Sequence, residues 1–205
     1  MMRDSVLNFA PEIVFFEKGN MWNSAVKCAY QKWEIQSENE NLLCCAGAEI
    51  WYALLEMDYW RFAPNKIQDM EFVDIDEVHE LLWKVASYGE KNFAENVMFN
   101  AYFGYMYTVT PYRFNGYNGD YIGWQKKGER MIRKAFEKEP GNLLVRALAS
   151  IGNDSAFSDA CCELWANVTP EQWGTGAVQE YFFFILGGQK FYPSAYECKK
   201  RPQIT

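Results

Sequence analysis

The chain has 205 residues, of which 49% are hydrophobic and 23% are charged, a composition typical of a globular protein with one substantial core. Its net charge of -7 argues against nucleic acid or an anionic membrane as the main partner, because both bind positively charged surfaces. Aromatic residues make up 18% of the chain. Some tyrosine and tryptophan rings are therefore expected at the surface, where they suit protein contacts.

The negative charge is concentrated near the start of the chain. Residues 1–80 contain 15 acidic and 6 basic residues, whereas residues 81–205 contain 12 acidic and 14 basic residues. Residues 1–20 lack the apolar run of a secretory signal, and the apolar run at 181–186 is too short to span a bilayer. Apolar neighbours of the vicinal pairs Cys44-Cys45 and Cys161-Cys162 are typical of reduced core thiols. We therefore expect a cytoplasmic protein.

Apolar residues between the proline and glycine breaks recur mostly at helical spacing. In chain order, helices are predicted over residues 22–35, 40–60, 74–89, 92–109, 121–139, 142–151, 156–166 and 170–186. The stretches EIVFFEKG, from residue 12, and MEFVDI, from residue 70, could instead be short extended segments. The prediction is an all-α fold of about seven to eight helices in a single domain spanning residues 1–205. Residues 1–20 would be an N-terminal extension and residues 188–205 a C-terminal tail.

Three of these helices have recognisable ends. Asp74 and Glu77 fit a capping box at the start of the helix over 74–89, and Gly89 is a plausible stop. Thr169 and Gln172 fit the same box, with Pro170 in the first turn. Pro140 ends the helix over 121–139. Residues 111–124, PYRFNGYNGDYIGW, are predicted to form a long loop rich in aromatic residues.

The stretch KAFEKEPGNLLVRALAS, residues 134–150, resembles the junction between tetratricopeptide repeats. Gly128, Ile132, Ala135 and Pro140 stand at the small, bulky apolar, small and proline positions of that motif, and Phe103, Gly104 and Tyr107 stand at the large, small and aromatic positions of the preceding helix. The resemblance implies a right-handed array of antiparallel helical hairpins. The aromatic loop makes this repeat longer than the roughly 34 residues of the family, so the array would be degenerate. A plain helical bundle is the alternative.

The sequence contains no recognisable catalytic or metal-binding motif. The one histidine, His79, lies on an amphipathic helix, where a position at the boundary of the core is a simpler interpretation than a catalytic base. The cysteine pairs lack the spacing of a zinc site, and the glycine-rich loop lacks the order of a phosphate or calcium loop. We therefore expect a protein without enzymatic activity, cofactor or metal.

Two groups of residues are predicted to bind a partner. The first is an acidic cluster formed by Glu71, Asp74, Asp76, Glu77 and Glu80, although acids in a first helical turn also offset the positive helix dipole. The second is aromatic and comprises Tyr112, Phe114, Tyr117 and Tyr121. Packing of these rings over their own hairpin is the alternative for the second group.

The chain resembles bacterial immunity proteins of the contact-dependent growth inhibition class, because it is small, acidic and rich in aromatic residues and has no recognisable catalytic motif. The resemblance is one of type, not of motif. It implies a protein partner, expected to be a basic nuclease toxin domain whose active site an acidic surface would cover. Two alternatives remain open: a repeat-type scaffold or secretion chaperone that holds a peptide segment in a concave groove, and an enzyme whose site is assembled from scattered residues.

Overall fold

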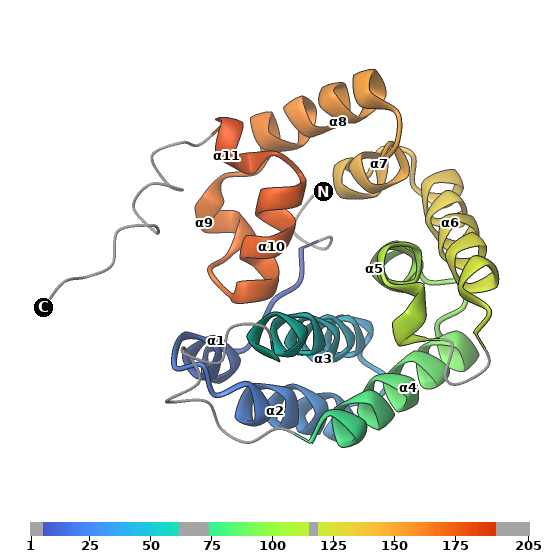
Figure 1. The fold of residues 1–205 in the computed structure, drawn as a ribbon. Helices are drawn as coiled ribbons and strands as arrows, with labels where there is room; N and C mark the ends of the chain where they lie inside the picture. Colours follow the sequence, from blue (N-terminus) through green and yellow to red (C-terminus); the bar gives the residue numbers. More distant parts are fainter. Residues whose placement is uncertain (1–5, 62–73, 115–118, 192–205) are drawn as a thin grey trace, which may run out of the picture.

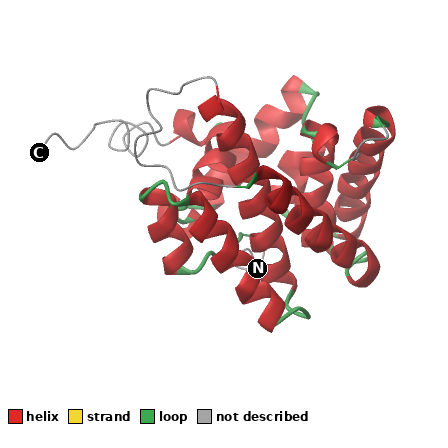
Figure 2. Cartoon of the chain, turned by 60° about the horizontal axis from the view of Figure 1, so that its bottom comes forward, coloured by secondary structure: helices red, strands yellow, loops and turns green. Residues whose placement is uncertain are grey.

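The computed structural model describes residues 6–61, 74–114 and 119–191, and all regular structure in these ranges is helical (Figure 1; Figure 2). The α-helices are α1 (Pro11–Lys18), α2 (Trp22–Ile35), α3 (Glu40–Arg61), α4 (Ile75–Asn92), α5 (Val97–Val109), α6 (Tyr121–Lys138), α7 (Leu143–Ala149), α8 (Asp154–Asn167), α9 (Pro170–Trp173), α10 (Ala177–Ile185) and α11 (Gly188–Phe191). A short 3-10 helix, η2 (Pro111–Arg113), follows α5. The all-α prediction is confirmed for this part of the chain.

Several predicted boundaries are correct because local signals set them. Helix α2 matches its predicted range, and α6 begins at the expected residue and ends one residue early. Asp74 caps α4, since its carboxylate accepts hydrogen bonds from the backbone N–H groups of Asp76 and Glu77. Both bonds of the predicted capping box are present at α9: Thr169 N–H donates to the Gln172 side chain at 2.9 Å, and Gln172 N–H donates to the Thr169 hydroxyl at 3.4 Å.

The ends of the described chain were predicted wrongly. EIVFFEKG is helical, as part of α1, and residues 6–18 are not an extension, because Leu7, Phe9 and Ile13 are buried in the core. Residues 188–191 form α11, which contacts α8 and α10, instead of starting a tail. Residues 192–205 and residues 70–73 of MEFVDI lie outside the described residues.

Three glycine-containing stretches also differ from the predictions. The helix expected over 170–186 is divided into α9 and α10 at Gly174, whose φ of +96° is left-handed and favours glycine. Helix α4 continues past Gly89 to Asn92, and a Cβ at Gly89 would overlap the ring of Phe99. Gly89 therefore allows a close helix contact and does not end the helix. Within 111–124, only residues 114–120 separate η2 from α6.

The helices follow one another along a curved path and pack as adjacent antiparallel pairs (Figure 1). Helix α5 lies at the centre. All its residues from Met98 to Tyr107 are buried, and it packs against α3, α6 and α7. A helix that is apolar on every side can be stable only where other elements surround it. The path closes where α10 returns to contact α1 and α3.

The pairing of α5 with α6 depends on two glycines that face each other. A Cβ on Gly104 would lie 2.9 Å from the Gly128 carbonyl oxygen, and a Cβ on Gly128 would overlap the Gly104 carbonyl oxygen. Ile132 and Ala135 continue the buried face of α6. The close approach predicted from these small residues is therefore confirmed.

This contact makes the α5–α6 pair sensitive to added side-chain volume. We expect Gly104→Leu to lower the free energy of unfolding by about 1–3 kcal/mol or more, because the new side chain must push the helices apart. Chemical denaturation followed by circular dichroism measures this change. Gly141→Leu is the matched control, since a Cβ there meets no atom within 4 Å, and it should change the free energy by less than about 0.5 kcal/mol. Equal unfolding midpoints for the two variants would contradict the glycine-mediated packing.

Candidate functional site

The first half of α4 presents acidic side chains to solvent. Asp76, Glu77 and Glu80 are exposed, whereas Val78 and Leu82 of the same helix face the core. Among the described residues, no lysine, arginine or histidine forms an ion pair with these three acids. Asp74 is exposed as well, but its carboxylate is engaged in capping. Glu71, the fifth residue of the predicted acidic cluster, lies outside the described residues.

The predicted aromatic group divides into a buried ring and two exposed rings. Phe114 is 1% exposed, and its ring centroid lies 4.4 Å from that of Tyr107 and 6.1 Å from that of Trp124. Phe114 therefore packs in the core against α5 and α6, as the alternative of packing over its own hairpin predicts for this ring. Tyr112 and Tyr121 are 47% and 50% exposed, so both rings are accessible to a partner. Tyr117 lies outside the described residues.

A buried arginine next to the exposed Tyr112 ties η2 to α3 and α4. Arg113 donates a hydrogen bond to the Leu54 carbonyl oxygen of α3 at 2.9 Å, and its Nη1 lies 2.9 Å from His79 Nε2 of α4. The guanidinium also lies 5.2 Å from the centre of the Tyr112 ring, a distance typical of a cation–π contact. His79 thus sits at the edge of the core, as its amphipathic setting suggested.

A second contact ties the start of α6 to α4. The rings of Trp83 on α4 and Trp124 on α6 pack edge to face with centroids 5.9 Å apart, and Tyr121 lies one helical turn before Trp124. The elements that carry the two predicted groups are therefore neighbours in the structure. We call Asp76, Glu77, Glu80, Tyr112 and Tyr121 the acidic–aromatic surface.

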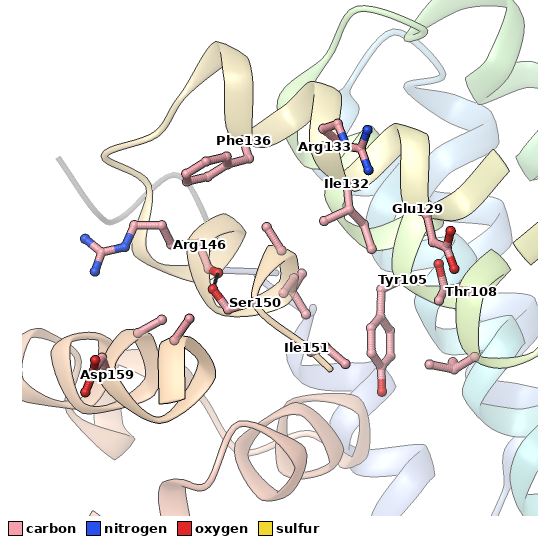
Figure 3. Close-up of a pocket in the computed structure, with 15 residues that line it drawn as sticks. Tyr105, Thr108, Glu129, Ile132, Arg133, Phe136, Arg146, Ser150, Ile151 and Asp159 are labelled. Atoms are coloured by element: carbon pink, nitrogen blue, oxygen red, sulfur yellow. Dashed lines mark hydrogen bonds between the residues drawn. The ribbon is translucent and has the colours of Figure 1, made fainter. Parts of the chain in front are cut away.

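A groove of about 670 Å³ lies between α5, α6, α7 and α8 (Figure 3). Side chains of α5 and α6 form one wall, and side chains of α7 and α8 form the other. Three large apolar side chains that are exposed to solvent line it, namely Val109, Phe136 and Ile151. Sequence reasoning did not identify this groove, because its lining comes from four helices and a turn.

The polar groups on the floor of the groove already have partners. Thr108 donates to the Gly104 carbonyl oxygen and Ser150 to the Arg146 carbonyl oxygen, both at 2.8 Å. The Tyr105 hydroxyl lies 2.8 Å from that of Tyr181. Four charged side chains also line the groove: Arg133 and Glu129 on α6, Asp159 on α8 and Arg146 on α7. The floor therefore suits apolar contact more than polar recognition.

The cysteines are mostly core thiols, as predicted. Cys44, Cys45 and Cys161 are buried, and burial raises the pKa of each, that of Cys161 to about 11. Cys162 is exposed, so the core prediction is wrong for that residue. Within the described ranges, no three His, Cys, Asp or Glu side chains lie close enough together to hold one metal ion.

No known family, curated protein or solved structure matches the chain in the three comparisons. In the part of the chain that the structure describes, every helix is too short or too polar to cross a bilayer.

The role of Arg113 as an anchor for η2 can be tested separately from any binding. Arg113→Met should lower the free energy of unfolding by about 1–3 kcal/mol, because the buried Leu54 carbonyl oxygen loses its donor. Tyr112→Ala should cost less than about 1 kcal/mol, since the ring is half exposed and loses mainly its contact with Arg113. Urea denaturation of both variants measures the difference. Equal losses would show that Tyr112 has a structural role instead of being available for a partner.

Proposed function

We propose that this protein is a non-enzymatic protein-binding protein, and specifically an immunity protein that neutralises a basic toxin domain by covering its active site. The observation that supports this most is the acidic–aromatic surface: the α4 carboxylates have no ion-pair partner among the described residues, and the exposed rings of Tyr112 and Tyr121 are on η2 and α6, which both contact α4. Charges without internal partners remain available to an external one. Tyrosine rings provide anchors of low conformational entropy.

The charge of this surface sets the chemistry of the proposed partner. Nuclease active sites are rich in lysine and arginine because they hold phosphates. Three carboxylates on the first half of α4 would attract such a site over a distance of about a Debye length and speed encounter. The tyrosines would then contribute to the lifetime of the complex, since buried aromatic anchors mainly reduce dissociation. Such a partner would act in the cytoplasm, where we propose this protein resides.

We also propose that the helices form a degenerate, right-handed array of the tetratricopeptide type. The close contact of Gly104 with Gly128 supports this, as does the break at Pro140 between α6 and α7. In such an array the helical pairs act as a rigid frame, and the surface between them is free to bind.

The groove favours a second candidate function, a scaffold or secretion chaperone that holds a peptide segment. Val109, Phe136 and Ile151 offer exposed apolar area within one concavity, and apolar area in a groove is typical of helix or peptide recognition. This candidate predicts binding with little dependence on salt, in contrast to the acidic–aromatic surface.

Charge reversal distinguishes the two candidates. The triple variant Asp76→Lys, Glu77→Lys and Glu80→Lys should slow association with the proposed basic toxin domain by about tenfold or more at low salt, because steering becomes repulsion. Stopped-flow binding at several salt concentrations measures the rate. The control reverses Glu137, Asp154 and Glu171, which are exposed on α6, α8 and α9, and so changes the net charge equally. Equal rates for both triple variants would contradict the proposal.

The groove has its own test. Ile151→Glu would place a charge among apolar lining residues and should weaken peptide binding at least tenfold if the groove holds the partner, because burying an unpaired carboxylate is unfavourable. Isothermal calorimetry with segments of the partner measures the affinity. Ile122→Glu is the control, since Ile122 is 66% exposed and does not line the groove. Unchanged affinity in the Ile151 variant would exclude the groove as the binding site.

A further inference from the structure

The two ends of the helical path are joined by hydrogen bonds. The Ala177 N–H, in the first turn of α10, donates to Glu17 Oε2 of α1 at 2.9 Å. The Gln179 side chain donates to the Leu7 carbonyl oxygen at 3.2 Å. These bonds connect residues 160 and 172 positions apart. Figure 1 shows α10 lying over α1 and α3.

The Glu17 carboxyl group meets a second carboxyl group from α3. Glu49 is fully buried, and its carboxyl interacts with that of Glu17. No described hydrogen-bond donor reaches either oxygen of Glu49, and none reaches Oε1 of Glu17. Two carboxylates in contact inside a protein do not both ionise, because each charge opposes the other where water cannot screen them.

Geometry assigns the proton of this pair to Glu49. Glu17 accepts a backbone N–H at the start of α10, and both a hydrogen bond of this kind and the helix dipole favour the ionised form. Glu49 has no such donor among the described residues. Protonated Glu49 and ionised Glu17 are therefore the arrangement that places one negative charge where it is best stabilised.

Among the described residues, the other groups facing the pair provide no positive charge. Cys28 of α2 faces Glu49, Tyr52 of α3 faces Glu17, and Glu180 of α10 lies near Glu17. Glu56 of α3 accepts the Tyr52 hydroxyl proton at 2.7 Å. Lys32 of α2 pairs instead with Glu12 at 3.5 Å. A second negative charge at Glu49 would thus have no compensating cation in the part of the chain that the structure describes.

We propose that Glu17 and Glu49 form a proton-dependent latch, in which one shared proton holds the first turn of α10 against α1 and α3 and loss of that proton loosens α10. The latch is formed by α1, α3 and α10, whereas the acidic–aromatic surface is on α4, η2 and α6. A test of the latch is therefore independent of the proposed partner binding.

The direction of the pH effect follows from linkage. Burial, the largest cause, raises the pKa of both Glu17 and Glu49 above the ordinary value of 4.5. The closed form therefore binds the proton more tightly than an open form in which the carboxyls are solvated. The stabilisation is fully present below the ordinary pKa and is lost as pH rises through the raised value. Low pH thus favours the form in which α10 packs against α1 and α3, and high pH favours the open form.

Native-state hydrogen exchange between pH 5.5 and 9 tests the latch. In the wild-type chain, the opening constant of the α10 amides, corrected for intrinsic exchange, should rise by up to tenfold per pH unit until the raised pKa is passed, because one proton is released on opening. Glu49→Gln keeps the shape and a hydrogen-bond donor, but it cannot ionise, so its opening constant should be independent of pH over this range. Glu137→Gln removes an exposed carboxylate of α6 and should retain the wild-type slope.

Two results would overturn the latch. One is an opening constant of the wild-type α10 amides that does not change with pH. This result does not depend on whether any variant folds. The other is a Glu49→Gln chain that retains the wild-type slope. The amides of α6 serve as an internal reference, since a change shared by α6 and α10 would indicate global unfolding and not release of α10.

Discussion

The close contact between α5 and α6 is the constraint on which the rest of the structure depends. Two helices approach this closely only where neither carries a side chain at the crossing, and Gly104 and Gly128 meet that condition for each other. Once α6 is held there, α5 is enclosed by α3, α6 and α7, and its apolar residues can all be buried. The other pairs then extend outward from this centre along the chain.

Both candidate surfaces originate at the C-terminal end of α5. Val109, the last residue of α5, lines the groove, and η2 begins two residues later and carries Tyr112. Thr110 joins them, and its hydroxyl accepts a 2.6 Å hydrogen bond from the buried Trp51 ring. Surfaces built on such fixed backbone lose little conformational entropy on binding. Arg113, which contacts the Tyr112 ring, then holds η2 to α3 and α4, so the backbone that carries Tyr112 is fixed by the core.

Sequence reasoning succeeded where the determining contacts are local. The cap at Asp74, the box at Thr169 and the small residues of α5 and α6 each act within one helix or one hairpin. It failed where contacts with distant segments of the chain determine whether a side chain is buried. Arg113 is polar and lies two residues after a proline, so nothing in its neighbourhood predicts burial, which comes from α3 and α4. Phe114, likewise, looks like any other ring of an aromatic loop until Tyr107 and Trp124 enclose it.

Acidic residues serve two opposite purposes in this chain, and counting charges along the sequence cannot separate them. On α4, the exposed carboxylates have no ion-pair partner among the described residues, their mutual repulsion is screened by water, and their attraction for a cationic partner is available. Between α1, α3 and α10, carboxyls of the same chemical type are buried, and the low polarity around them keeps a proton on the pair. The net charge of the first 80 residues therefore overstates the charge at the surface. Glu49 contributes to the composition but not to the field that a partner meets, whereas Asp76, Glu77 and Glu80 contribute to both.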